Sequence, residues 1–188
     1  DVLHVEVEVT GDLNATDNIS VAALSGLEML NIPLDTSQPM SWNCSVSLTS
    51  TSVDTNDTPQ VTELSGEVIS HANPSFSYTE DIDWHTFNIE FELNTGVQTF
   101  DVWLFNYGYD GTQSLLEIDE IGEPDAPIYF HGLSTDVVGS IPVLMTFEID
   151  TDAVDTGMYS SFVPIGVSDE DLPGELSTIS MLAINVDV

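Results

Sequence analysis

The side chains that could do chemistry in this sequence are carboxylates gathered in short, loop-like segments. Calcium binds about six to eight oxygens, mostly from carboxylates and carbonyls that loops supply. We therefore predict that at least one acidic segment binds a divalent cation, calcium first. The candidate ligands are Asp81, Asp83, Asp110, Asp119, Asp150, Asp152 and Asp155. The alternative for each segment is a solvated acidic surface, and residues 150–157 have the wrong spacing for an EF-hand loop.

The sequence gives little support for a catalytic site. The 4 histidines form no HxH or HxxxH pair, so a zinc or copper site would need ligands distant in sequence. No Gly-x-Ser-x-Gly elbow is present for a nucleophilic serine. Asp155-Thr156-Gly157 matches the aspartic-protease tripeptide alone, and a two-lobed protease needs a longer chain. We predict that the protein is not an enzyme.

The charge balance excludes several classes of partner. The chain of 188 residues has 33 Asp plus Glu and no Lys or Arg, for a formal charge of −33. Nucleic acids and anionic membranes are bound through basic residues, so we expect neither as a partner. A P-loop and a pyridoxal Schiff base both need lysine. Copies of such a chain repel one another unless high salt, divalent cations or low pH intervene. This favours an extracellular, saline setting and a halophilic or archaeal source.

Processing signals also indicate the cell exterior. The single cysteine, Cys44, rules out an intrachain disulfide, and we expect a buried small hydrophobe there rather than an intermolecular thiol. No apolar run approaches the roughly 18 residues of a membrane span, so we expect no membrane insertion. A chain that starts at Asp1 without Met indicates removal of a signal peptide.

Asn-x-Ser/Thr sequons predict glycosylation in the first third of the chain. The acceptors are Asn14, Asn18, Asn43 and Asn56. Asn43 falls inside a strand pattern and is the least certain of them. Glycans are therefore expected on the surface.

The elements that must position these residues are strands, because apolar residues recur with a period of two. We predict four strands near the middle and start of the chain, at 2–10, 41–53, 84–93 and 100–104, with Thr95-Gly96 joining the last two as a hairpin. Further strands are predicted at 127–131, 141–149, 159–167 and 177–188, and shorter ones at 18–24, 61–70, 76–79 and 114–118. Residues 23–31 could form one or two helical turns.

About ten short strands with turns between them predict an all-β fold with little helix. The expected architecture is a single-domain antiparallel β-sandwich or jelly-roll-like barrel over 1–188. We find no internal repeat and no linker.

Aromatic residues gather after the predicted hairpin. We expect the tryptophans Trp42, Trp84 and Trp103 to pack in the core. Tyr107-Gly108-Tyr109 follows a strand and is expected in a loop, where the rings could stack on a sugar.

The two terminal segments are strongly strand-forming. Residues 1–10 are predicted to be a donor strand or an edge strand, with Leu3, Val5, Val7 and Val9 as the donated side chains. A strand lent to a neighbouring copy builds a fibre through main-chain hydrogen bonds and needs no ion pairs. The C-terminal strand is the alternative donor.

These features predict a structural subunit of an extracellular or cell-surface assembly: a filament, pilus-like fibre, sheath or tube built from identical subunits. One alternative is a jelly-roll capsid protein of a halophilic virus. Another is a calcium-dependent adhesin or carbohydrate-binding module. An adhesin of this kind is usually one repeat of a longer chain, whereas we expect this chain to be complete. No motif identifies a known family.

Overall fold

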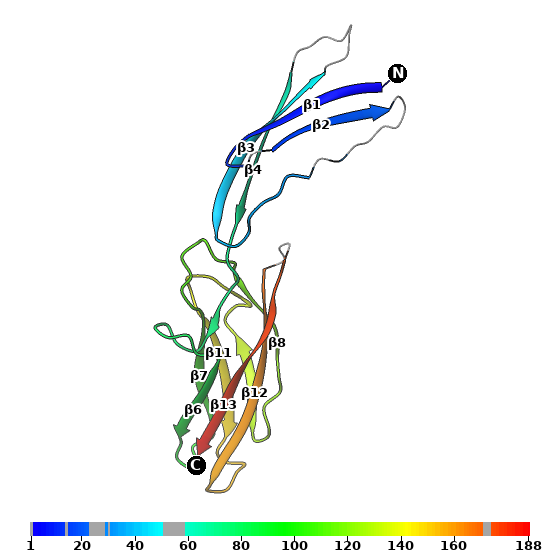
Figure 1. The fold of residues 1–188 in the computed structure, drawn as a ribbon. Coiled ribbons are helices and arrows are strands. Elements are labelled where there is room, and N and C mark those ends of the chain that lie inside the picture. The colour runs from blue at the N-terminus through cyan, green and yellow to red at the C-terminus, as the bar shows by residue number, and fades with distance from the viewer. Residues whose placement is uncertain (1, 14, 23–28, 30, 51–58, 171–173) are drawn as a thin grey trace. The chain divides into compact units, whose positions relative to one another are not determined.

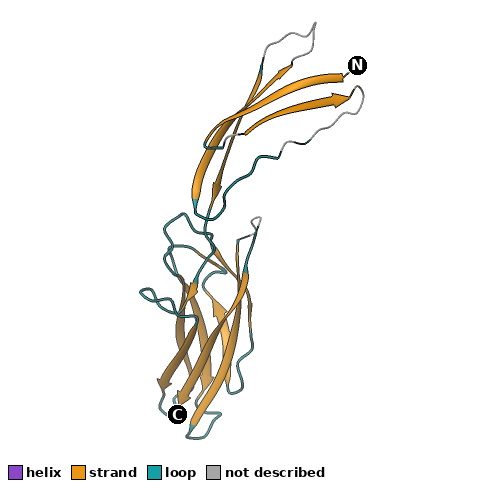
Figure 2. Cartoon of the chain, viewed as in Figure 1, coloured by secondary structure: helices purple, strands orange, loops and turns teal. Residues whose placement is uncertain are grey.

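The computed structural model describes residues 2–13, 15–22, 29, 31–50, 59–170 and 174–188. Their regular secondary structure is entirely strand, as Figure 2 shows. The predicted all-β class is therefore confirmed. The chain divides into two compact units, Asp1–Ile69 and Ser70–Val188. The assignment of 1–188 to one domain stays a prediction, and the two units are described separately.

Unit 1 is a single antiparallel sheet in the order β2-β1-β3-β4 (Figure 1). Its strands are β1 (Val2–Gly11), β2 (Ala15–Ala22), β3 (Met40–Ser50) and β4 (Gln60–Val68). The alternation of apolar and polar residues gives this sheet one apolar and one acidic face. Among its described residues three apolar side chains are buried: Val7, Val9 and Cys44. Burial of the lone cysteine confirms that prediction.

Unit 2 is a β-sandwich of two sheets. The first has the order β10-β8-β12-β13-β6 and the second β5-β7-β11-β9. Its strands are β5 (Pro74–Ser75), β6 (Trp84–Glu90), β7 (Val97–Asn106), β8 (Leu116–Ile121), β9 (Ile128–Leu133), β10 (Val137–Val138), β11 (Val143–Asp150), β12 (Met158–Asp169) and β13 (Ser177–Asp187).

The core of unit 2 lies between these two sheets. Every second residue of β11 is buried, including Met145 and Phe147, and they meet Ile165 of β12 and Ile184 of β13 in one apolar cluster. Stacked aromatic rings fill its centre, with the ring centroids of Phe100 and Phe147 at 5.7 Å. Burial of this two-sided apolar surface is the main source of the unit's stability.

The predicted hairpin at Thr95-Gly96 is wrong. β6 pairs in parallel with β13, whereas β7 pairs with β5 and β11 in the other sheet. The connection therefore crosses from one sheet to the other. Phe87 and Phe100 stack across the core with ring centroids 5.6 Å apart. A period of two marks the inward residues of both strands, but it does not show whether the strands pair side by side or face each other.

Two short predicted segments, 76–79 and 23–31, are not found as predicted among the described residues. Residues 76–79 form bends instead of the predicted strand, because the Ser75 hydroxyl closes this segment into a loop through hydrogen bonds to Glu80 and Ile82. Most of the segment 23–31, for which helical turns were expected, lies outside the described residues.

Candidate functional site

The predicted metal ligands lie in separate parts of unit 2. Asp81 and Asp83 precede β6, Asp110 follows β7, and Asp119 lies within β8. Asp150, Asp152 and Asp155 belong to the turn between β11 and β12. In the described part of the chain no group of three or more His, Cys, Asp or Glu side chains is arranged to hold a metal ion. Calcium binding stays a prediction.

Several of these carboxylates stabilise their own loops. Asp110 Oδ1 accepts hydrogen bonds from Thr112 N at 2.9 Å and from Thr112 Oγ1 at 2.8 Å. The backbone hydrogen bond to Thr112, followed by the side-chain one, lowers the pKa of Asp110. Asp150 Oδ1 accepts from Asp152 N, and Asp152 Oδ1 accepts from Gly96 N. Asp150 and Asp152 are thus two predicted ligands that a hydrogen bond joins directly.

Two of the four predicted glycosylation acceptors fall on described strands. Asn18 lies in β2 opposite Glu6, and Asn43 is exposed in β3, with its backbone hydrogen-bonded to Asp12. Asn14 and Asn56 lie outside the described residues. Glycosylation stays a prediction at all four positions.

Neither terminal strand is an edge strand. β1 lies between β2 and β3, and β13 lies between β12 and β6. The expectation that residues 1–10 form an edge strand is therefore wrong, whereas donation of this strand, with Leu3, Val5, Val7 and Val9, stays a prediction. To be donated, β1 would have to leave partners on both of its sides. The alternating pattern identified a strand but carried no information on its neighbours in the sheet.

The edges of the unit 1 sheet are β2 and β4, and β4 pairs with β3 and with no other described strand. Most of its residues are exposed, including Val61 at 57% and Leu64 at 39%. Natural edge strands are commonly protected by lysine, proline or bulges. β4 contains neither lysine nor proline, and its charged residues are Glu63 and Glu67.

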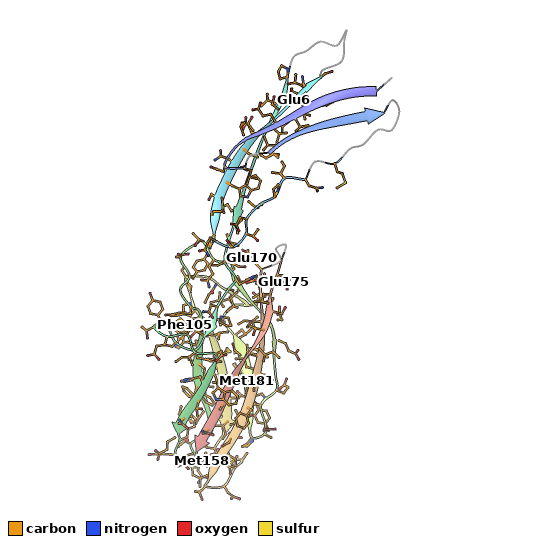
Figure 3. The ribbon with its side chains drawn as sticks, viewed as in Figure 1. Glu6, Phe105, Met158, Glu170, Glu175 and Met181 are labelled. Atoms are coloured by element: carbon orange, nitrogen blue, oxygen red, sulfur yellow. The ribbon has the colours of Figure 1, made fainter. Side chains whose placement is uncertain are left out.

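One face of the unit 1 sheet is apolar along three strands. Cross-strand partners share a face, and Val9 lies opposite Val46, Val7 opposite Leu48, and Cys44 opposite Leu64. We call this surface the N-terminal apolar face: Val5, Val7, Val9, Trp42, Cys44, Val46, Leu48 and Leu64. These eight residues carry no charge, and Glu6, labelled in Figure 3, and Glu8 lie on the other face. On the fourth strand, β2, the position opposite Val7 is Asp17. Unit 1 has no second described sheet to cover the apolar face.

The tryptophans are not core residues, contrary to expectation. Trp84 is 54% exposed and Trp103 is 47% exposed, and Trp42 is half-buried. Trp84 lies on the outer face of the five-stranded sheet, where its ring meets Phe162 at 6.1 Å between centroids. Met181 pairs with Trp84 on the same face, and Figure 3 labels it on β13. In unit 2, Trp84 and Trp103 lie at strand positions whose side chains point away from the core. The alternating sequence pattern is equally compatible with this orientation.

A buried carboxylate that sequence reasoning missed anchors the start of unit 2. Asp169 is 4% exposed and accepts hydrogen bonds from Ala72 N at 2.6 Å and Leu176 N at 3.0 Å. His71 Nδ1 lies 2.6 Å from the same carboxylate. Burial raises the pKa of Asp169, but the hydrogen bonds from Ala72, His71 and Leu176 outweigh it and bring the pKa below its usual value.

Two further histidines, His85 and His131, have described side chains. His85 stacks on Phe76 with ring centroids 5.9 Å apart. His131 Nδ1 lies 3.2 Å from Glu148 Oε2 at an exposed position. No described histidine belongs to a cluster with metal-site geometry.

No helix among the described residues is long and apolar enough to cross a membrane. No family model and no curated protein matches the chain.

Several solved structures resemble it at a distance. A protein of unknown function from Porphyromonas gingivalis W83 has 10% identity and a TM-score of 0.41, covering 98% of this chain and 85% of the other. CfaE, the adhesive subunit of the CFA/I fimbria of enterotoxigenic Escherichia coli, has 11% identity and a TM-score of 0.42, covering 98% and 72%. The VesB protease of Vibrio cholerae also has 11% identity and a TM-score of 0.42, covering 100% and 63%. At this level of similarity none of them assigns a family or a function to the chain.

Proposed function

We propose that this chain is a non-enzymatic structural subunit of an extracellular assembly, such as a filament, pilus-like fibre, sheath or tube. Identical copies join through unit 1, by strand addition at β4 and burial of the exposed part of the N-terminal apolar face around Leu48 and Leu64. The observation that carries the proposal is the amphipathic single-layer sheet of unit 1. A sheet with one apolar face is stable when a second layer covers that face. The described residues of unit 1 form no second sheet, and although Val7, Val9 and Cys44 are already buried, Leu48 and Leu64 remain exposed.

A second copy fits this surface because its residues on β1, β3 and β4 are uncharged and do not repel their counterparts. The residues of the N-terminal apolar face carry no carboxylate, and Glu6 and Glu8 point to the opposite side of the sheet. The carboxylate position next to this face is Asp17 of β2, opposite Val7. Two copies joined there keep Glu6 and Glu8 in solvent. Main-chain hydrogen bonds along β4 add directional contacts that need no basic side chain.

Cations regulate the joining step in this proposal. Each copy carries a formal charge of −33, so approach of two copies is opposed at low ionic strength. The screening length falls from about 30 Å at 0.01 M salt to about 3 Å at 1 M. Salt or divalent cations bound by the acidic loops therefore permit assembly, and the saline exterior of a cell supplies both.

The test is sedimentation velocity with negative-stain imaging of the purified chain. Samples contain calcium or chelator, each at low and high salt. We expect oligomers or fibres at high salt or with calcium, and monomers with chelator at low salt. A monomer in every condition, at protein concentrations up to the millimolar range, would contradict the proposal.

A further inference from the structure

A pocket of about 350 Å³ opens at the end of β7 in unit 2, and aromatic rings form much of its wall. The rings come from Tyr78, Phe105, Tyr107 and Tyr109, and the remaining lining comes from Asn106, Gly108, Gly139, Ser140 and Pro142. This volume falls at the lower end of the roughly 300–1,000 Å³ range of small-molecule sites. All of its lining residues belong to unit 2, whereas the residues that we assign to assembly belong to unit 1.

Tyr78 is held over the pocket by a loop that a single buried hydroxyl closes. Ser75 is fully buried, and its Oγ donates to Glu80 O at 2.7 Å and accepts from Ile82 N at 3.0 Å and Ser77 N at 3.1 Å. At the tip of this loop Tyr78 is 77% exposed. Its ring contacts that of Phe105, with centroids 6.0 Å apart and planes at 60°. Figure 3 labels Phe105 on the side of the unit where the loop projects.

Tyr107 and Tyr109 are placed by a tight turn at the end of β7. Gly108, between them, has a φ of 76°, in the left-handed region that favours glycine. Tyr109 N donates to Asn106 O at 3.3 Å. The Tyr109 ring also lies close to the backbone of Gly139, where a Cβ would be in van der Waals contact with Tyr109 Cζ at 3.5 Å.

Asn106 locks the three chain segments that meet beneath the pocket. Its Oδ1 accepts from Asn73 N at 2.9 Å, and its Nδ2 donates to Ser114 O at 2.8 Å and Val138 O at 3.4 Å. The side chain is 5% exposed. Because its amide is fully used inside the protein, Asn106 is a positioning residue and leaves ligand contacts to the aromatic side chains and Ser140.

The chemistry of the pocket wall limits the class of ligand that can bind. No charged side chain lines the pocket, and the phenol hydroxyls of Tyr78, Tyr107 and Tyr109 hydrogen-bond to no other described residue. The wall therefore offers flat apolar ring faces together with hydroxyl groups that both donate and accept hydrogen bonds. The C–H faces of a pyranose ring stack on aromatic rings, and its hydroxyls match those donors and acceptors.

The charge of the chain excludes acidic ligands. With 33 carboxylates and no basic residue, the protein repels uronic acids, sulfated sugars and nucleotides. A quaternary ammonium would gain from the ring faces, but it would leave the hydroxyl groups of the wall without partners. We propose that this pocket binds a neutral saccharide unit, stacked between the tyrosine rings.

The experiment uses the full chain and a panel of neutral saccharides, namely glucose, galactose, mannose, N-acetylglucosamine and their disaccharides. Binding is followed by two-dimensional NMR shifts during titration. Glucuronic acid and tetramethylammonium serve as anionic and cationic probes. Tyr107→Ala removes one ring of the pocket. Tyr129→Ala is the matched control, because Tyr129 is an exposed tyrosine on β9 outside the pocket.

We expect saturable shifts with at least one neutral saccharide, a loss of affinity of at least tenfold in Tyr107→Ala, and unchanged affinity in Tyr129→Ala. Circular dichroism confirms that both variants fold. No saturable binding by any neutral saccharide at tens of millimolar would overturn the inference. Tighter binding of tetramethylammonium or glucuronic acid, or equal losses in the two variants, would do the same. Because the assembly surface lies on unit 1, this result is independent of the assembly test.

Discussion

His71 Nδ1 and Asp169 Oδ2 lie 2.6 Å apart, although 98 positions separate them in the chain. Through the same carboxylate, the first residues of unit 2 are fastened to the end of β12 and to Leu176. Asp169 therefore joins three segments of unit 2 in one hydrogen-bonded group. A buried carboxylate with several charge-assisted hydrogen bonds contributes more to stability than an exposed ion pair.

Replacing this carboxylate destabilises unit 2. Asp169→Asn substitutes an amide group for one acceptor oxygen and leaves at least one buried N–H without a partner. We expect a loss of about 1–3 kcal/mol in the free energy of unfolding, measured by urea denaturation at pH 7. Asp35→Asn is the control, because it removes the same charge from an exposed residue whose hydrogen bond is local, to Ser37. Equal stabilities of the two variants would contradict this role.

The contribution of Asp169 also depends on pH. Its pKa is lower in the folded protein than in the unfolded chain, so its stabilising effect is fully present above the unfolded value of about 3.9. The effect disappears as the pH falls through the folded pKa. The stability difference between the native chain and Asp169→Asn should therefore shrink below about pH 4. A difference that stays constant down to pH 2 would refute this account.

The loop that carries Tyr78 depends on Ser75. Ser75→Ala removes the oxygen that bonds Glu80, Ile82 and Ser77. We expect a stability loss of about 1–3 kcal/mol together with faster hydrogen exchange at Ile82 and Ser77. The matched control is Ser160→Ala, an exposed serine whose hydroxyl bonds the Asn185 side chain. If exchange at Ile82 is the same in both variants, the hydroxyl does not hold the loop.

The acidic turn after β11 gives a direct test of cation binding. If Asp150 and Asp152 hold calcium, millimolar calcium raises the unfolding temperature through mass action on the folded state, and chelator reverses the effect. The double variant Asp150→Asn/Asp152→Asn should lose this calcium-dependent rise. The double variant Glu63→Gln/Glu67→Gln, with the same change of charge in β4, should keep it. The same rise in both double variants would show general screening instead of a site.

The strands could be predicted from the sequence because successive side chains of a strand point to opposite faces of the sheet. An alternation of apolar and polar residues therefore marks a strand directly. β7, β11, β12 and β13 lie close to their predicted ranges for this reason. Pairing could not be predicted, since Phe87 and Phe100 show the same inward phase whether they are neighbours in one sheet or face each other across the core. For the same reason, the sequence could not show that β1 lies between two other strands of its sheet.

Part of the candidate pocket could be predicted from the sequence. Tyr107 and Tyr109 follow a strand and flank a glycine, which marks a turn with exposed rings. Tyr78 and Phe105 could not be assigned to the pocket, because residues 76–79 were predicted to be a strand and the closure of this loop depends on the Ser75 hydroxyl. No local sequence pattern indicates the hydrogen-bonded group around Asp169, because its partners lie near residue 71 and at Leu176.

The most direct test of the central claim is the sedimentation velocity of Leu64→Lys in β4 against Val97→Lys in β7, at high salt with calcium. Both residues are exposed, and both changes add one positive charge, so screening is altered equally. A lysine on the β4 edge opposes strand addition and disrupts the N-terminal apolar face. The proposal predicts that Leu64→Lys stays monomeric while Val97→Lys assembles like the native chain. Equal assembly of both variants would contradict it.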